Sequence, residues 1–318
     1  MSLQKPMISS RIDRVTLIPE SHRKTICPVP RSVKIELTSR CDLRCKFCAT
    51  SKGLREKGDM DLDLYKRIVS EMAYEGVKEI GVFYLGESAL YPYLAEAIAH
   101  ANMEGIEYVF LTTNGRMLNQ NLLYNMFESG LDSLKFSFNS YDATQYKEVT
   151  GVDGFDKVVA NIRLAREVRD DVYARTGHYC GLYASSIQFD GEQMRLMEES
   201  SKENVIPFVN EHYWLPLYNQ AGFTQGAMGK RSVAGNIGRV GALRDPLPCW
   251  ALFTEGHVTW DGILTGCCFS HDGSWDFGDL KTMPFMKAWN SKSAQNLRQA
   301  NLNKDVTGTA CEKCIAYA

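Results

Sequence analysis

Residues 33–50 have the sequence VKIELTSRCDLRCKFCAT, in which a short β-branched run leads directly into a CxxxCxxC motif. The motif cysteines are Cys41, Cys45 and Cys48. Three thiolates so close together can converge on one soft metal centre, and no nearby histidine completes a tetrahedral zinc site. A cubane iron–sulfur cluster fits the spacing better, because three cysteines leave one iron open to a ligand. A zinc knuckle that takes a distant fourth cysteine is the alternative.

The composition limits the classes of function. The 318 residues are 44% hydrophobic and 23% charged, values typical of a globular protein with a substantial core. The formal net charge of −2 gives no indication of binding to nucleic acid or to an anionic membrane. The sequence has no apolar run of membrane-spanning length, and its N-terminus lacks the apolar segment of a secretory signal. We therefore expect a cytoplasmic protein whose ten cysteines serve metal or redox chemistry rather than disulfides.

Strand-like and helix-like segments alternate over the first two thirds of the chain. We expect strands at 33–38, 78–86, 106–115, 132–139, 181–189 and 205–213, and helices at 62–76, 93–105, 119–130, 154–169 and 191–203. Six strand–helix units in succession predict a parallel sheet with helices outside it, curved or closed as a barrel. A complete barrel of this type needs about eight such units, so the sheet falls short of one.

A second group of cysteines lies near the C-terminus. Asp261-Gly262 stands between two alternating runs in 256–267, which predicts a hairpin that returns the chain to Cys267. The sequence CEKC closes the chain, and we expect an amphipathic helix over 284–301 before it. Four thiolates suit either zinc or a fully ligated iron–sulfur cluster, and in isolation zinc is favoured. The four proposed ligands are Cys249, Cys267, Cys311 and Cys314.

The stretch ELTSRCDLRCKFCAT resembles the signature of radical S-adenosylmethionine (SAM) enzymes. The resemblance implies a partial (β/α)6 TIM-type barrel with a 4Fe–4S cluster on the three motif cysteines. The open iron would bind SAM, whose reductive cleavage gives a 5′-deoxyadenosyl radical that abstracts hydrogen from a substrate. It also implies a flavodoxin- or ferredoxin-type electron donor. By position, the residues expected to contact SAM are Phe47, Gly86, Glu87, Asn114, Ser137 and Asn139, with Leu85 in place of a family glycine.

The spacing from Cys249 to Gly262 and Cys267 resembles the opening of the SPASM extension of that family. The chain stops soon after Cys314, so the shorter, Twitch-like form with a single auxiliary 4Fe–4S cluster is expected. Cys268 is adjacent to Cys267, and an exchange of their roles stays open. The expected division is an N-terminal extension (1–32), a radical SAM partial barrel (33–215), a Gly-rich linker or active-site cover (216–245) and a Twitch-like domain (246–318).

Three further residues are candidates for catalysis. Cys180, at the start of the fifth strand, and Cys268 are thiols that could donate a hydrogen atom to a substrate radical, as an epimerase requires. His212, with Asn210 and Glu211 in the sixth strand, is a candidate base or substrate contact. For each of these residues, an ordinary structural role is the alternative.

Together these patterns predict an enzyme that oxidises a small polar substrate such as a sugar or an aminocyclitol, with the auxiliary cluster as electron acceptor. The short segment before the barrel argues against a peptide substrate. Three alternatives stay open: a radical SAM epimerase, a ribosomal-peptide-modifying maturase, and a non-enzymatic zinc-binding module. No nucleic-acid or membrane partner is expected.

Overall fold

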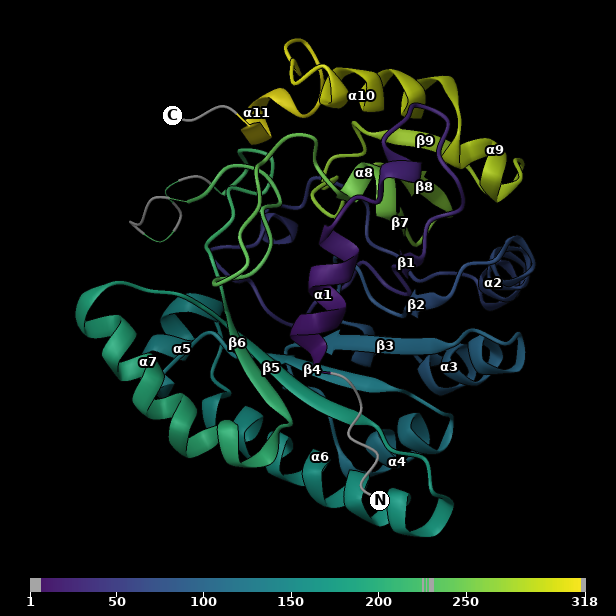
Figure 1. The fold of residues 1–318 in the computed structure, drawn as a ribbon. Coiled ribbons are helices and arrows are strands. Elements are labelled where there is room, and N and C mark those ends of the chain that lie inside the picture. Colours follow the sequence, from purple (N-terminus) through teal and green to yellow (C-terminus); the bar gives the residue numbers. More distant parts are fainter. Residues whose placement is uncertain (1–6, 225, 227, 229–231, 316–318) are drawn as a thin grey trace.

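The computed structural model describes residues 7–224, 226, 228 and 232–315. Six parallel strands pair in chain order and form the curved sheet of a partial barrel, as predicted (Figure 1). The strands are β1 (Ser32–Ile35), β2 (Glu79–Gly81), β3 (Tyr108–Thr113), β4 (Ser133–Ser137), β5 (Gly181–Ile187) and β6 (Glu211–Leu215). The predicted extension, linker and C-terminal domain each include positions (1–6, 225, 227, 229–231, 316–318) that lie outside the described residues.

The helices that follow the strands cover the outer face of this sheet (Figure 1). They are α2 (Leu62–Glu75), α3 (Leu94–Met103), α4 (Gln120–Glu128), α5 (Ala143–Thr150), α6 (Phe155–Thr176) and α7 (Gly191–Asn204). Their ends follow local chemistry: the Asp61 side chain accepts a hydrogen bond from the backbone of Leu64, and Gly76 ends α2 with a φ of 101°. Among these helices, α5 was not predicted. Short 3₁₀ turns are η1 (Glu20–His22), η2 (Ala49–Lys52), η3 (Ser88–Leu90) and η4 (Ile206–Phe208).

The prediction of the sixth strand was wrong by several residues. Its expected range, 205–213, contains the turn η4 with Pro207 inside it, and β6 begins only at Glu211. Proline has no backbone N–H for a sheet ladder, so a turn there is the natural outcome.

Helix α1 (Ile8–Thr16), which was also not predicted, lies against the concave side of the sheet (Figure 1). Its Arg11 guanidinium stacks on the ring of Phe110 at 3.8 Å and forms a 2.6 Å ion pair with Glu79. Both partners belong to barrel strands, so α1 is fixed inside the curve of the sheet.

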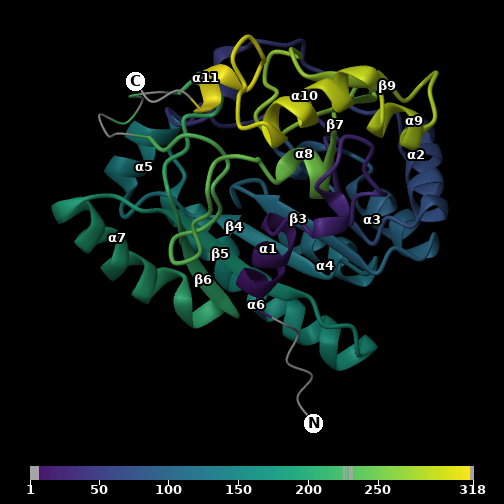
Figure 2. The ribbon, with the colours of Figure 1, turned by 45° about the horizontal axis from the view of Figure 1, so that its top comes forward.

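The C-terminal part continues the same sheet beyond β1 (Figure 2). Strand β7 (Glu255–Val258) pairs in parallel with β1, and β8 (Ile263–Thr265) and β9 (Asp276–Asp279) follow in antiparallel order. The hairpin at Asp261-Gly262 is therefore confirmed, with a φ of 86° at Gly262. The remaining helices are α8 (Ala251–Thr254), α9 (Phe285–Trp289), α10 (Lys292–Leu302) and α11 (Glu312–Ile315).

The single helix expected over 284–301 is two helices. The first ends at Trp289, and Ser291 caps α10 by accepting a hydrogen bond from Ala294 N. The side chain of Asn290, between them, is bonded to the backbone of Cys27 in the N-terminal segment. A tertiary contact thus breaks a helix that the periodicity alone would continue. None of the helices in the described ranges has the length and apolar character needed to cross a membrane.

Candidate functional site

A cavity of about 300 Å³, here called the upper cavity, lies at the carboxyl ends of the barrel strands. Parallel barrels build their sites at this end, where the loops after the strands converge. Its lining brings together every residue expected to bind the first cluster or SAM: Cys41, Cys45, Phe47, Cys48, Gly86, Glu87, Asn114, Ser137 and Asn139.

The motif loop is held by contacts with distant parts of the chain. The backbone N–H groups of Arg44 and Lys46 donate to carbonyls at the end of α5, at 2.8 and 2.9 Å. On its other side, Gln220 of the Gly-rich segment accepts from Ala49 N and donates to Phe47 O, each at 2.9 Å. The loop is therefore positioned by the fold before any metal binds.

Gly86 allows a close approach of two backbones. A Cβ atom on Gly86 would lie 2.0 Å from the carbonyl oxygen of Thr38 and 2.8 Å from that of Arg40. The next residue, Glu87, donates its N–H to Arg40 O at 2.8 Å. Only glycine fits there, and this contact ties the loop that follows β2 to the loop that carries Cys41.

The carboxylate of Glu87 is buried at the cavity wall. It accepts hydrogen bonds from Thr113 Oγ1 at 2.7 Å, from Asn114 N at 2.7 Å and from Ala89 N at 3.1 Å. Burial raises the pKa of Glu87 to about 7, against the opposing effect of these donors. A carboxylate has further acceptor sites, so Glu87 can still accept from an ammonium group in the cavity.

The side-chain amides of Asn114 and Asn139, in the wall of the upper cavity, form hydrogen bonds with the motif loop and with the backbone of β5. The Nδ2 group of Asn114 donates to Asp42, inside the cysteine motif, at 2.8 Å, and Arg116 pairs with the other oxygen of Asp42 at 2.9 Å. The Oδ1 atom of Asn139 accepts from Ile187 N at 2.9 Å. Asp42, which the sequence analysis did not single out, is thus a positioning residue for the motif.

The motif thiols suit a metal centre. Burial raises the pKa of Cys41 to about 12 and also raises that of Cys45, where the neighbouring cysteines add to the effect. Thiols of this kind stay protonated unless a metal replaces the proton. The three motif cysteines all line this cavity, as a site-differentiated iron–sulfur cluster requires.

The C-terminal cysteines also gather at one place. Burial raises the pKa of Cys249, and the charges of Cys311 and Cys314 add to it, which places these three side chains close together. Cys267 and Cys268 both join this group: burial raises the pKa of Cys267, and Cys268, Cys249 and Cys314 add to the effect, while burial raises the pKa of Cys314 and Cys268 adds to it. Either of the two adjacent cysteines therefore fits the role of fourth ligand.

Three asparagines that sequence analysis missed support this group. Asn301, on α10, accepts from Cys249 N at 3.1 Å and donates to the sulfur of Cys311 at 3.8 Å. Asn236 donates to the sulfur of Cys268 at 3.1 Å, and Asn219 donates to Cys314 O at 3.0 Å. Scattered asparagines carry no spacing signal, so only the structure identifies them.

The zinc alternative can be compared with the cysteine spacing. A tetrahedral zinc ion with bonds of about 2.3 Å brings its sulfurs roughly 3.8 Å apart, whereas a cubane separates its cysteine sulfurs more widely. Within the described residues, no three His, Cys, Asp or Glu side chains are close enough to share one metal ion.

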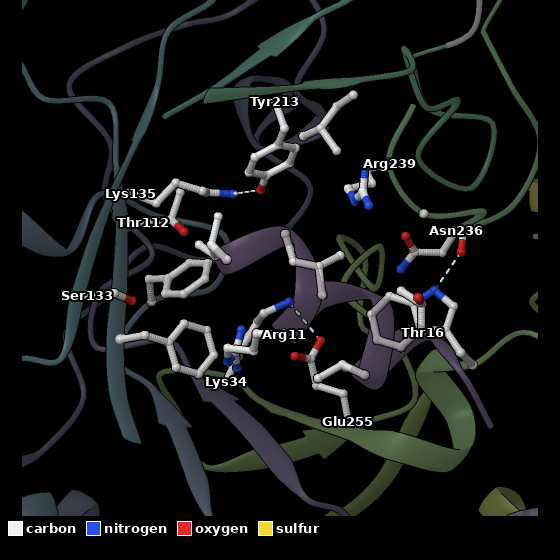
Figure 3. A pocket seen from close by; sticks show the side chains of 18 of the residues that line it. Arg11, Thr16, Lys34, Thr112, Ser133, Lys135, Tyr213, Asn236, Arg239 and Glu255 are labelled. Atoms are coloured by element: carbon white, nitrogen blue, oxygen red, sulfur yellow. Dashed lines mark hydrogen bonds and ion pairs between the residues drawn. The ribbon is translucent and has the colours of Figure 1, made fainter. Parts of the chain in front are cut away.

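A second cavity of about 170 Å³, here called the lower cavity, lies deeper between α1 and the sheet (Figure 3). The two cavities share Phe83, Thr112, Lys135, Leu215 and Tyr218 in their linings, so they adjoin each other. Sequence analysis missed Lys135, although a lysine inside the otherwise buried strand KFSF was a signal.

His212, a candidate base from the sequence, lines neither cavity. Side chains alternate along a strand, and Tyr213 and Leu215 line the cavities, so His212 points to the helical side of β6. There it is 2.9 Å from the Ser186 hydroxyl and packs edge-on against Trp214. Asn210 is likewise structural, because its Oδ1 accepts from Leu182 N at 2.8 Å.

Cys180, a candidate hydrogen donor with a structural role as the alternative, also lies away from both cavities. Cys180 is buried before the first residue of β5, at the amino ends of the strands, and lines neither cavity. Cys268 lines neither cavity either, but its partner Asn236 lines the lower one. Neither thiol stands where a hydrogen donor to a cavity substrate is needed.

Comparisons with known proteins agree with this architecture. Residues 35–187 match the model of the radical SAM superfamily, and residues 249–315 match that of the SPASM iron–sulfur cluster-binding domain. Among curated relatives, a GTP 3′,8-cyclase of Chlorobaculum tepidum is 32% identical over 127 residues, which are 40% of this chain and 38% of the relative. A PqqA peptide cyclase of Rhodopseudomonas palustris is 33% identical over 127 residues, 40% of this chain and 33% of the relative. The chain thus matches less than half the length of these relatives.

Solved structures show the same fold at low sequence identity. BtrN in complex with AdoMet and 2-DOIA aligns with a TM-score of 0.57 at 16% identity, covering 86% of this chain and 88% of BtrN. Streptococcus suis SuiB bound to the precursor peptide SuiA aligns with a TM-score of 0.65 at 14% identity, covering 86% and 67%. With its cysteine motif at the mouth of a six-stranded partial barrel, the chain therefore carries a radical SAM domain over residues 35–187, which implies a 4Fe–4S cluster with SAM, and a SPASM domain over residues 249–315, which implies auxiliary iron–sulfur.

Proposed function

We propose that this protein is a radical SAM oxidoreductase that removes hydrogen from a carbon of a small polar metabolite, such as a sugar or an aminocyclitol. One observation carries the proposal. The upper cavity, which the cysteine motif lines, adjoins the lower cavity, which α1 covers from the concave side of the sheet. A lower cavity of about 170 Å³ suits a compact molecule.

In this proposal, Cys41, Cys45 and Cys48 hold the first cluster. Glu87 accepts a hydrogen bond from the SAM ammonium, and Phe47, Gly86, Asn114, Ser137 and Asn139 form the rest of the SAM-binding wall. Cys249, Cys311, Cys314 and one of the pair Cys267 and Cys268 hold the auxiliary cluster. The bound groups supply a hydrogen-abstracting radical and an electron acceptor.

Oxidation is favoured over epimerisation by the placement of the thiols. An epimerase needs a hydrogen donor on the far side of the substrate radical, and Cys180 and Cys268 line neither cavity. Oxidation needs only that the substrate radical lose a proton and an electron, which turns a C–H and O–H pair into a carbonyl.

Peptide modification is the second candidate. The similarity to the PqqA peptide cyclase of Rhodopseudomonas palustris covers 40% of this chain and favours it. In that case the peptide side chain to be modified would enter the cavities, with the rest of the peptide outside.

A flavodoxin- or ferredoxin-type electron donor and a cytoplasmic location belong to either form of the proposal. The domain division at residues 32, 215 and 245 belongs to both as well.

The test is anaerobic reconstitution with iron and sulfide, followed by SAM and dithionite. We expect 5′-deoxyadenosine and methionine from the wild type and neither from Cys45→Ala. A panel of small polyols and amino sugars is then screened for a product lighter by two hydrogens. The absence of 5′-deoxyadenosine from a fully reconstituted wild type would refute the radical reading. A mass change found only with peptides would replace the small substrate by a peptide.

A further inference from the structure

Lys135 lies in the middle of β4, where its side chain enters the junction of the two cavities. Along this strand Ser133 lines the lower cavity, Ser137 the upper one, and Lys135 both. Leu134 and Phe136, which alternate with them, are fully buried in the core. The lysine ammonium is thus next to the proposed SAM wall, on the side where a substrate would lie.

The other cations around the lower cavity already have carboxylate partners. Arg11 pairs with Glu79 at 2.6 Å, Lys34 with Glu255 at 2.7 Å, and Arg239 with Asp13 at 2.7 Å. Lys135 differs: among the described residues its hydrogen-bond partner is the Tyr213 hydroxyl at 3.2 Å, and it forms no ion pair (Figure 3).

Such an arrangement leaves positive charge without a counter-ion. Of the charged side chains that line the lower cavity, Arg11, Lys34, Lys135 and Arg239 are cations and Glu255 is a carboxylate. Thr112, the register partner of Lys135 on β3, lines both cavities and adds a hydroxyl beside the ammonium. A buried ammonium without a partner is unfavourable, and an anion would relieve it.

We propose that Lys135, with the hydroxyls of Tyr213 and Thr112, binds an anionic group of the substrate, a carboxylate or a phosphate. This deepens the proposed function and rests on it, since it names an acid or a phosphate ester as the substrate class. The electrostatics agree: burial, followed by the charges of Lys34 and Arg11, lowers the pKa of Lys135 to about 7, and Glu255 opposes this. An entering anion would raise that pKa, so binding would bring a proton to the lysine near neutral pH.

The experiment measures binding of acetate and of inorganic phosphate to the reconstituted enzyme with SAM bound and no reductant. We expect saturable binding to the wild type that is at least tenfold weaker in Lys135→Met and retained in Lys135→Arg. Lys78→Met is the matched control, because Lys78 is half-exposed and pairs with Glu107. The more tightly bound of the two ions distinguishes a carboxylate from a phosphate substrate.

Acetate also provides a pH test, since its charge is constant above about pH 6. The charged and titratable groups that face Lys135 come from α1 (Arg11), β1 (Lys34), β6 (Tyr213) and β7 (Glu255). Burial raises the pKa of Tyr213, so among these groups Lys135 alone is expected to change charge between pH 7 and 9. Acetate affinity should therefore fall about tenfold per pH unit above 7 in the wild type and stay level in Lys135→Arg.

Three results would overturn the proposal. The first is that Lys135→Met binds the anions as tightly as the wild type does. The second is an adventitious ion only, seen as weak binding that does not saturate. The third is that Lys135→Met no longer binds SAM. The last would assign the ammonium to SAM instead of the substrate. None of these readouts requires SAM cleavage. Failure of the radical chemistry, read as missing 5′-deoxyadenosine, is therefore distinguishable from failure of the anion site.

Discussion

Gly86 and Thr38 approach so closely that a single added carbon on Gly86 would lie 2.0 Å from the Thr38 carbonyl oxygen. Thr38 precedes the motif loop by three residues, and the backbone of Glu87 is bonded to Arg40 in between. The loop that follows β2, through Gly86 and Glu87, thereby sets the position of Cys41.

Gly86→Ala should displace the motif loop, because both atoms that the new methyl group would meet belong to the backbone and cannot rotate away. We expect loss of about half of the iron and of all 5′-deoxyadenosine, with the auxiliary iron retained. Iron analysis and electron paramagnetic resonance check this. The control is Gly105→Ala, where φ is 83° and the space is open; it should lose about 1–2 kcal/mol of stability and no iron. Normal SAM cleavage by Gly86→Ala would contradict the proposed role.

Asn301→Leu should selectively remove the auxiliary iron. The substitution leaves the buried Cys249 N–H without its acceptor, at about 1–3 kcal/mol, and frees the sulfur of Cys311. Asn303→Leu is the matched control, since Asn303 is exposed one position beyond the end of α10. Iron content and thermal unfolding under anaerobic conditions provide the readouts. Full iron content in Asn301→Leu would show that this amide does not position the ligands.

His212 should affect stability at low pH and leave catalysis unchanged. Burial lowers the pKa of His212 from 6.5 to about 4. Its neutral form is favoured in the folded state, so the stability it contributes is present above pH 6.5 and is lost as the pH falls through 4. The loss in the wild type amounts to about 3 kcal/mol at most, since each pKa unit corresponds to about 1.4 kcal/mol. Denaturant unfolding of His212→Gln should show a smaller decline over this range, with 5′-deoxyadenosine formation as in the wild type. A pH-independent loss of turnover in that variant would restore His212 as a base.

Cys180→Ala should keep its catalytic activity. Cys180 is buried at the amino end of β5, where its Sγ donates a weak hydrogen bond to Gly181 O at 3.8 Å, so the change removes packing and this bond and is expected to lower stability by about 1 kcal/mol. Product formation in deuterated solvent measures the outcome. Solvent deuterium in the product of the wild type that disappears in Cys180→Ala would support an epimerase and contradict our reading of the cavity.

The sequence predicted the six parallel strands and the first metal site because both depend on local patterns. Buried runs such as 106–115 alternate with helices that end at glycines such as Gly76, and the CxxxCxxC spacing directly follows a strand. Helix α1 escaped prediction because its anchors, Arg11 to Phe110 and Glu79, join residues far apart in the chain.

The side of the sheet to which each side chain points was harder to predict. His212 and Tyr213 both fell within the predicted sixth strand, and only the structure shows that Tyr213 is the one that faces the cavity, since neighbouring residues on a strand point to opposite sides. Lys135 lies in a correctly predicted strand, but the sequence does not show which cations form ion pairs. In the structure Arg11, Lys34 and Arg239 each pair with a carboxylate, and among the described residues Lys135 does not.

The pairing of β7 with β1 has a consequence for protein engineering. Domain exchange between family members usually assumes that an appended module can be cut off at its linker. Here a cut in 216–245 would turn β1 into an open edge able to recruit a strand from another chain, and would separate Lys34 from Glu255. A chimera with a foreign C-terminal domain must therefore also supply a strand that matches residues 32–35, with a carboxylate opposite Lys34.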